Sequence, residues 1–248
     1  MSNEKRKGDL VGKDTPFAIT EAYRTARTNI MFSLSTSKKK IMVVTSSNPT
    51  EGKSTTCANM GLILAEMGAS VLIIDADMRK PTIHKQFSIP NVNGLSSILG
   101  GLIDAKIGVN ENVAENLDVI TAGIIPPNPA GLLSSDFMAN FLSALSEHYD
   151  YILIDTPPIN VVTDSQLLNG IVSGILFVVR EGVTTHNDIA AALRSVEMAN
   201  GNILGFFKVG CSYGGARGYK KYKYKYKYDY SYGTPATATG VQKEIEKV

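Results

Sequence analysis

Three kinds of residue in this chain stand out for the chemistry that they could perform: a lysine after a glycine, aspartates at the ends of apolar runs, and closely spaced tyrosines. The lysine lies in Gly52-Lys53-Ser54, which follows the apolar run 41–44 and precedes a second apolar run, 58–67. Strand, polar loop, Gly-Lys-Ser and helix form the layout of a phosphate-binding P-loop, although Ser47 stands where that pattern usually begins with glycine. The expected phosphate cradle consists of Asn48, Pro49, Thr50, Glu51, Gly52, Lys53, Ser54 and Thr55.

Such a loop holds an anion because its backbone N–H groups and the N-terminus of the following helix point at the ligand. Gly52 lets the backbone approach the phosphates closely. Lys53 can reach the outer phosphate oxygens, and the hydroxyl of Ser54 can bind Mg²⁺. The motif therefore predicts nucleoside triphosphate binding.

Aspartates close two of the apolar runs. Asp75 and Asp77 follow the run SVLIID, and Asp155 ends the run YILID. The carboxyl ends of parallel strands lie at the edge where open α/β sheets bind ligands, so these carboxylates are expected beside the P-loop. The expected metal ligands are Ser54, Asp77 and Asp155, and the expected catalytic residues are Lys53, Asp75, Asp77, Arg79 and Asp155.

The tyrosines indicate where the phosphate goes. Beyond Gly210 they recur at almost every second position: Tyr219, Tyr222, Tyr224, Tyr226, Tyr228, Tyr230 and Tyr232. Water as acceptor would make the protein an ATPase, whereas a hydroxyl as acceptor makes it a kinase. The chain from Gly210 to Tyr224 reaches up to about 45 Å, at roughly 3.3 Å per residue, which permits delivery to a neighbouring subunit. We expect Asp77 to orient or deprotonate the tyrosine, with Arg79 and Lys53 neutralising charge.

The same segment has competing interpretations. Interleaved lysine and tyrosine would also suit single-stranded nucleic acid or an anionic membrane, and a bland low-complexity tail is a third interpretation. Residues 217–232 carry six Lys or Arg side chains against one Asp, a net charge of +5. Phosphorylation of all seven tyrosines would add about −10 to −14 charges. The sign of the segment would invert, so a partner that reads charge would be gained or lost.

Length and composition suit a cytoplasmic protein. The 248 residues suffice for one large or two small α/β domains, and the formal net charge is only +2. The two cysteines lie far apart, without metal-ligand spacing, which favours a reducing compartment. The N-terminus lacks the apolar core of a signal peptide, and no apolar run has the length of a bilayer span. We expect a chain that reaches the membrane only through a partner.

Apolar runs alternate with segments of helical periodicity, which predicts a mostly parallel sheet with helices on both faces. The expected strands are 41–44, 70–75, 117–122, 151–155, 174–180 and 202–209. The expected helices are 16–34, 58–67, 94–99, 130–148, 161–170 and 185–200, with a short one at 241–248. The fold class is thus α/β and P-loop NTPase-like. The predicted regions are a flexible arm, 1–15, a P-loop kinase domain, 16–209, and a disordered Tyr/Lys-rich tail, 210–248.

Glu21, Arg24 and Arg27 recur at three-residue spacing on the first predicted helix. One interpretation is a solvated face with a local Glu–Arg pair that contributes about 0.2–0.5 kcal/mol. The other is a self-complementary edge, on which a glutamate meets the arginines of a neighbouring subunit. Spacing alone favours the solvated face.

Taken together, these motifs resemble the bacterial tyrosine kinases of capsular and exopolysaccharide synthesis, in the stand-alone cytoplasmic form of Gram-positive bacteria. The resemblance covers nearly the whole chain. Its motifs are NPTEGKST, VLIIDADMRKP, ILIDTPP, the EAYRTAR stretch at Glu21–Arg27 and the tyrosine cluster. Members of that family generally carry glycine where this chain has Thr50, which puts the flexibility of the loop in question.

The resemblance implies an ATP-dependent kinase, with Mg²⁺, that phosphorylates its own tyrosine cluster in trans. It implies that Glu21, Arg24 and Arg27 mediate self-association into a ring, against the interpretation from spacing alone. It also implies a membrane adaptor or polysaccharide co-polymerase that activates the kinase at the inner face of the membrane, and a cognate tyrosine phosphatase. Cycling of phosphorylation would regulate polysaccharide polymerisation and export.

Two alternatives remain open. A partition-type or division-site ATPase would share the fold, but such proteins typically carry a lysine at the position of Asn48, and the tyrosine tail argues against this class. A nucleic-acid or membrane-binding module would leave the catalytic motifs unexplained, so we expect no specific nucleic-acid partner.

Overall fold

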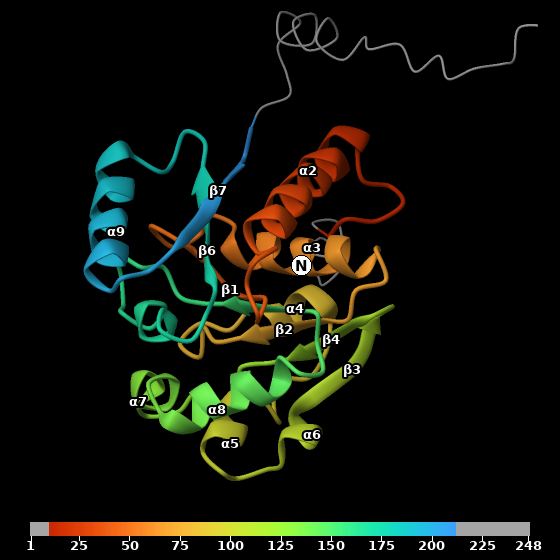
Figure 1. Cartoon of the computed structure of the whole chain (residues 1–248), viewed down its shortest axis with the longest axis vertical. Coiled ribbons are helices and arrows are strands. Elements are labelled where there is room, and N and C mark those ends of the chain that lie inside the picture. The colour runs from red at the N-terminus through yellow and green to blue at the C-terminus, as the bar shows by residue number, and fades with distance from the viewer. Residues whose placement is uncertain (1–9, 212–248) are drawn as a thin grey trace, which may run out of the picture. The chain divides into compact units, whose positions relative to one another are not determined.

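The computed structural model describes residues 10–211. Their strands are β1 Ile41–Ser46, β2 Val71–Asp75, β3 Val109–Ala114, β4 Leu117–Ile120, β5 Tyr151–Asp155, β6 Gly174–Arg180 and β7 Ile203–Val209. These form a seven-stranded sheet in the order β3-β4-β2-β5-β1-β6-β7, which crosses the middle of Figure 1. Neighbouring strands are parallel except at one edge, where β3 is antiparallel to β4.

Helices cover both faces of this sheet (Figure 1). One face carries α2 Phe17–Ser33, α3 Lys53–Ala65 and α4 Ile83–Phe87. The other carries α5 Leu95–Leu99, α6 Ala105–Gly108, α7 Pro129–Leu133, α8 Asp136–Leu145, the 3-10 turn η1 Gln166–Leu168 and α9 His186–Met198. The predicted P-loop NTPase-like α/β class is therefore confirmed.

The central strands are apolar throughout because both of their faces are buried. In β1, Ile41 and Val43 pack into the hydrophobic cluster under α5, α7, α8 and α9, whereas Met42 and Val44 pack into the cluster under α2 and α3. This is the two-residue alternation of a strand. Because β1 lies between β5 and β6, the loop that follows it starts from the interior of the sheet.

The predicted helix 130–148 is two helices. Asn128 accepts a hydrogen bond from the Gly131 N–H at the start of α7, and Ser135 accepts one from the Met138 N–H at the start of α8. Serine is a favoured N-cap, so Ser135 begins a new helix inside an otherwise apolar helical pattern. The predicted helix 161–170 is also wrong, because that segment forms turns and only the short 3-10 turn η1.

Three further elements were missed: α4, α6 and β3. The strand β3 has the polar sequence VNENVA, an irregular register against β4 and a left-handed residue, Asn112. Such an edge strand lacks the apolar pattern by which strands are recognised. The predicted arm 1–15, apart from residues 10–15, and the predicted helix 241–248 lie outside the described residues.

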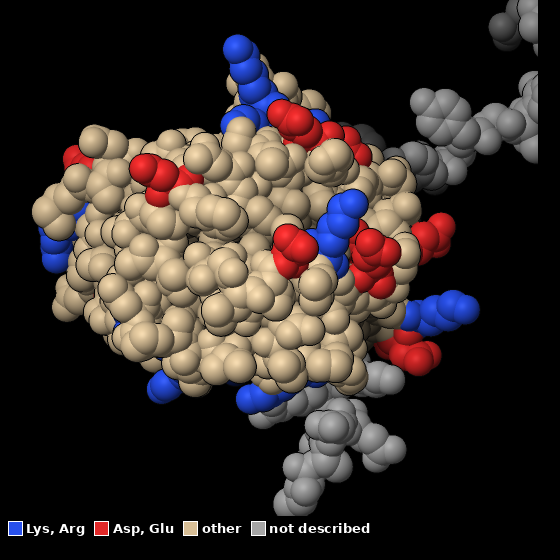
Figure 2. Space-filling view, turned by 90° about the horizontal axis from the view of Figure 1, so that it is seen from below, with Lys and Arg blue, Asp and Glu red and all other residues tan. Residues whose placement is uncertain are grey.

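Figure 2 views the molecule from below Figure 1, where α5 and α6 lie lowest, with α7 and α8 above them. Scattered charges of both signs stand on a mostly uncharged surface, and this face shows no continuous basic patch among the described residues. In the described part of the chain, no helix has both the length and the hydropathy that crossing a bilayer requires.

Candidate active site

The P-loop connects the carboxyl end of β1 to the N-terminus of α3, where the sequence pattern placed it. Gly52 precedes the helix in a left-handed conformation (φ 93°), which glycine adopts without strain. Lys53 and Ser54 open the first turn of α3 and are buried. The free N–H groups of this turn and the helix dipole therefore meet the loop, as a phosphate site requires.

The structure brings together four of the predicted site residues: Lys53, Ser54, Asp77 and Asp155. The ammonium of Lys53 donates to Asp77 Oδ2 at 2.9 Å and to Ser54 Oγ at 3.1 Å. It also lies 3.6 Å from Asp155 Oδ1. These contacts join the start of α3 to the ends of β2 and β5, which are neighbouring strands with Asp75 and Asp155 in register.

Burial dominates the electrostatics of this cluster. It raises the pKa of the Asp155 carboxyl, and Lys53 opposes that rise. Burial also raises the pKa of Asp75, and the charge of Asp155 adds to the effect. At Lys53 burial acts to lower the pKa, but the attraction of Asp155 and Asp77 outweighs it, so the pKa lies above its usual value. Lys53 is thus a buried cation held among carboxylates.

Several buried oxygen atoms at the site have no hydrogen bond of ordinary geometry within the described residues: the hydroxyls of Ser47 and Thr56, and both carboxylate oxygens of Asp155, which Ser54 and Lys53 nevertheless approach closely enough to favour the ionised carboxylate. Buried polar atoms are nearly always satisfied, so these atoms fit a site completed by a metal ion, by phosphate oxygens or by water. Among the described residues no group of three or more His, Cys, Asp or Glu side chains could hold a metal by itself. Mg²⁺ does not require such a cluster, because it usually binds one or two carboxylates together with substrate phosphates and water.

Asp75 points into its own loop. Its Oδ1 accepts the N–H of Asp77 at 3.2 Å, and its Oδ2 accepts the N–H groups of Thr82 and Ile83 at 3.1 and 3.0 Å. The structure therefore places Asp75 behind Asp77, where it organises residues 75–83. A contact between Asp75 and the reacting atoms stays a prediction.

Arg79 was also predicted at the reaction centre. Its guanidinium makes a two-pronged ion pair with Asp164, at 2.9 and 3.1 Å, and Asp164 is buried with 1% of its surface exposed. Sequence reasoning missed Asp164, because the pair joins residues 85 positions apart. The bond fixes the loop after β2 against the segment after β5.

The three residues predicted for self-association all have partners inside the chain. Arg24 pairs with Glu21 at 3.0 Å and with Glu66, the C-cap residue of α3, at 3.6 Å, and all three side chains are over 40% exposed. Arg27 donates to the carbonyl of Ile63 at 3.0 Å. Exposed ion pairs exchange partners at little cost, so the contacts of Glu21 and Arg24 leave these two side chains able to meet another subunit. The predicted acceptor tyrosines, from Tyr219 to Tyr232, lie outside the described residues.

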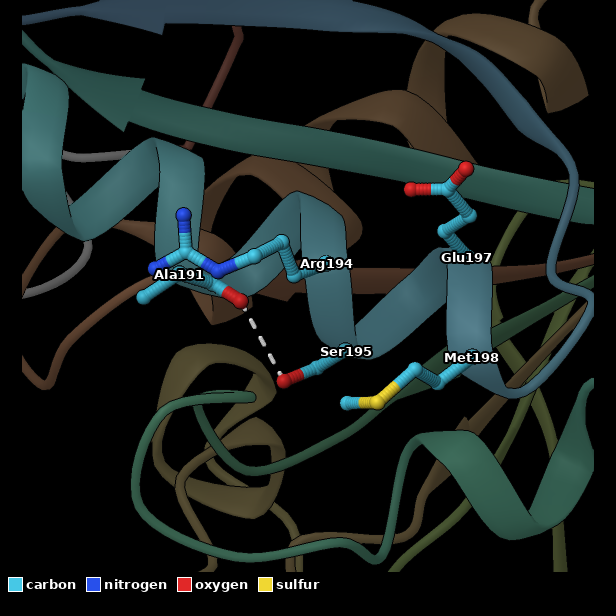
Figure 3. Close-up of a pocket in the computed structure, with 5 residues that line it drawn as sticks. All are labelled: Ala191, Arg194, Ser195, Glu197 and Met198. Carbon is cyan, nitrogen blue, oxygen red and sulfur yellow. Dashed lines mark hydrogen bonds between the residues drawn. The ribbon is translucent and has the colours of Figure 1, made fainter.

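A hollow in the surface lies away from these residues, along α9 (Figure 3). Its described lining comes from that helix alone: Ala191, Arg194, Ser195, Glu197 and Met198. The hydrogen bond drawn there, from Ser195 Oγ to the carbonyl of Ala191, is internal to the helix. No two elements bring reactive groups together at this hollow, so the P-loop remains the candidate active site.

Comparison with known proteins agrees with this geometry. Residues 38–179 match a family model described as an AAA domain. The tyrosine-protein kinase YwqD of Bacillus subtilis (strain 168) is 41% identical over 186 residues, which cover 75% of this chain and 78% of that protein. The putative tyrosine-protein kinase CapB of Staphylococcus aureus is 40% identical over 187 residues, 75% of this chain and 82% of that protein.

A solved structure shows the same fold. The crystal structure of the chimerical protein CapA2B2 superimposes with a TM-score of 0.74 at 37% identity, covering 79% of this chain and 85% of that one. The residues that match the AAA-domain family model, 38–179, include the P-loop and the strands β2 and β5 with their aspartates.

Proposed function

The chain belongs to the family of bacterial tyrosine-protein kinases, and from this premise we propose that it is an ATP-dependent kinase that phosphorylates its own C-terminal tyrosines. The observation that carries the proposal is the position of Lys53, held by Asp77 and Asp155 at the mouth of the P-loop. This cluster supplies what phosphoryl transfer requires: an anion cradle, a cation and metal-binding carboxylates.

In this proposal the backbone N–H groups of residues 50–55 hold the phosphates, and Lys53 turns from Asp77 to the outer phosphate oxygens. Ser54, Asp77 and Asp155 would hold Mg²⁺. The buried carboxylate oxygens of Asp155 are suited to bind such a cation. When bound, Mg²⁺ would neutralise charge that develops on the phosphate oxygens. The chain's own residues position the nucleotide.

The chemical step joins a tyrosine oxygen to the γ-phosphorus. The bond between that phosphorus and the bridging β–γ oxygen breaks, and ADP leaves. The phenol proton passes to a carboxylate, for which Asp77 is our candidate, since its Oδ2 becomes an acceptor once Lys53 moves to the phosphates. Asp75 supports this carboxylate by accepting the N–H of Asp77.

The finer parts of the proposal concern partners. We assign self-association to the face of Glu21, Arg24 and Arg27, and phosphorylation in trans to the resulting ring. A membrane adaptor would activate the kinase and bring it to the inner face of the membrane, and a tyrosine phosphatase would reset it. Through this cycle the protein would regulate capsular or exopolysaccharide synthesis and export.

The direct test incubates the full chain, together with the cytoplasmic end of its adaptor, with ATP and Mg²⁺. Phosphate is then mapped by mass spectrometry. We expect phosphate on tyrosines between Tyr219 and Tyr232. Consumption of ATP without phosphotyrosine would refute the kinase and favour the partition-type ATPase, especially if ATP also drove dimerisation.

A further inference from the structure

The outer side of the P-loop is bound by a segment that no motif identified: residues 180–185, which join β6 to α9. The guanidinium of Arg180 donates through Nη1 to the carbonyl of Thr50 at 2.8 Å. The hydroxyl of Thr184 donates to Glu51 Oε1 at 2.7 Å. Two neighbouring P-loop residues are thus bound by one connection that lies 130 positions further along the chain.

The first of these bonds meets a strained residue. Thr50 has a φ of 66°, in the left-handed region. A β-branched side chain disfavours that conformation, which glycine adopts freely. The peptide of Thr50 therefore tends to turn away, and the hydrogen bond from Arg180 to its carbonyl opposes this tendency.

The second bond meets a buried charge. Glu51 has 0% of its surface exposed, and its Oε2 accepts the N–H of Asn48 at 2.9 Å. The Thr184 hydroxyl donates the second hydrogen bond to this carboxylate and itself accepts the N–H of Arg180 at 2.8 Å. The hydrogen bonds form a chain from the end of β6 through Thr184 and Glu51 to the start of the P-loop. A buried carboxylate that loses one of its donors pays the cost of desolvation, so Thr184 stabilises the loop in this shape.

We propose that Arg180 and Thr184 are positioning residues for the nucleotide: they hold the strained turn at Thr50 so that Gly52 and Lys53 present their N–H groups to the phosphates. The proposal rests on the proposed function only in taking the P-loop as a nucleotide site. Neither residue has to contact the nucleotide, because both of these hydrogen bonds go to the loop.

The experiment measures the Kd of the full-length chain for a fluorescent ADP with Mg²⁺, along with kcat and KM for tyrosine phosphorylation. Arg180→Met should raise Kd and KM about tenfold, because it removes a charge-assisted hydrogen bond, and should leave kcat at saturating ATP within about twofold. Arg194→Met, on α9 away from the P-loop, is the matched control and should bind like the wild type.

Rescue separates positioning from contact. Thr50→Gly removes the strain that Arg180 opposes, so the double variant Arg180→Met with Thr50→Gly should recover to within about threefold of the wild-type Kd. Recovery supports the proposal. Loss of binding without recovery would show that Arg180 contacts the nucleotide and would overturn it, as would an unchanged Kd in Arg180→Met.

Thr184→Val keeps the proposal testable if Arg180→Met fails to fold. This variant is close in shape to the wild type and removes only the hydroxyl that donates to Glu51. We expect its Kd to rise about threefold to tenfold, and an unchanged Kd would overturn the role of Thr184. Failure of the wild type itself to bind the nucleotide would be a different result, because it would refute the proposed function.

Discussion

Lys53 is a cation whose partners change during the proposed reaction. Without a nucleotide its ammonium neutralises Asp77 and Asp155. With a nucleotide bound, the proposal has it bind the outer phosphate oxygens instead. The lysine has 9% of its surface exposed, and both carboxylates are more deeply buried. Removing one partner from a buried ion pair leaves an uncompensated charge, so we expect Lys53 to contribute to stability in addition to its proposed role in catalysis.

Lys53→Met should therefore abolish phosphorylation and also lower the stability of the nucleotide-free protein. We expect the free energy of unfolding to fall by roughly 3 kcal/mol, measured by urea denaturation. Lys38→Met, at an exposed lysine, is the control and should change neither property. Unchanged stability in Lys53→Met would show that water already screens the two carboxylates.

The raised pKa values of Asp75 and Asp155 predict a pH dependence. The folded state holds protons on these groups that the unfolded state has lost, so stability should decline as the pH rises above about 4, the ordinary pKa of an aspartate, towards neutrality. Asp155→Asn should flatten this slope, whereas Asp14→Asn, at an exposed position, should not. Urea denaturation at several pH values gives both slopes, and parallel slopes would count against the prediction.

Individual residues were predictable where a local motif carries the chemistry. Lys53, Ser54, Asp77 and Asp155 lie together, as their motifs indicated. The partners that hold the site in shape could not be found in this way. Asp164, Arg180 and Thr184 stand in no motif, and their bonds join segments 85 to 133 positions apart. Sequence spacing contains no information about such contacts.

At the scale of elements, α2 and α3 are joined by two different arginine contacts. Arg24 makes exposed ion pairs, whereas Arg27 binds a carbonyl of α3. Exposed pairs contribute little to stability. Arg24 can therefore exchange its partners for those of another subunit with little loss of stability. Arg27, in contrast, also holds α2 against α3 within one subunit.

Replacement of each arginine separates these roles. Arg24→Ala should leave the thermal midpoint nearly unchanged but reduce the assembled fraction in sedimentation experiments. Arg27→Ala should lower both, because the Ile63 carbonyl loses its donor. Assembly that persists in both variants would place the self-association surface elsewhere.

Helices and strands were predicted correctly from the sequence mainly where they are buried. Strands buried on both faces were recognised from their apolar runs, as in VLIID of β2 and YILID of β5. The edge strand β3 was not recognised because its sequence is polar, and the helices α4 and α6 were not recognised because they are too short to show a helical period. A single serine hydroxyl, that of Ser135, decides where the predicted helix 130–148 divides.

At the scale of the whole molecule, the proposal requires one subunit to act on another. Two variants test this requirement when they are mixed. Asp77→Asn keeps its tail but should lose activity, and a chain with Phe at the seven tyrosines from Tyr219 to Tyr232 keeps its site but lacks acceptors. We expect phosphate on the Asp77→Asn chain only in the mixture, as shown by mass spectrometry.

Each chain alone is the control, and the Phe chain should bind nucleotide like the wild type. Absence of phosphate in the mixture would mean that transfer occurs within one chain, or that Asp77→Asn prevents docking. The rate of phosphorylation in wild-type protein, diluted below the concentration at which it assembles, distinguishes these two explanations. Only transfer within one chain has a rate that is independent of protein concentration.

The fold class of this molecule, a mostly parallel sheet with helices on both faces, could be predicted because strands and helices alternate over most of the chain. Its predicted acceptor segment lies outside the described residues, and no local motif of the sheet specifies which surface meets another subunit.

The contacts of Lys53 also determine the order in which ligands arrive. Its ammonium lies beside Asp77 Oδ2 and Asp155 Oδ1, two of the oxygens that a divalent cation would need, so free Mg²⁺ must compete with a positive charge that the chain itself holds there. Metal and nucleotide should consequently enter as one complex, in a single compulsory step. Titration calorimetry with Mg²⁺ alone should detect no binding to the wild type, whereas the same titration of Lys53→Met should release the site to the metal.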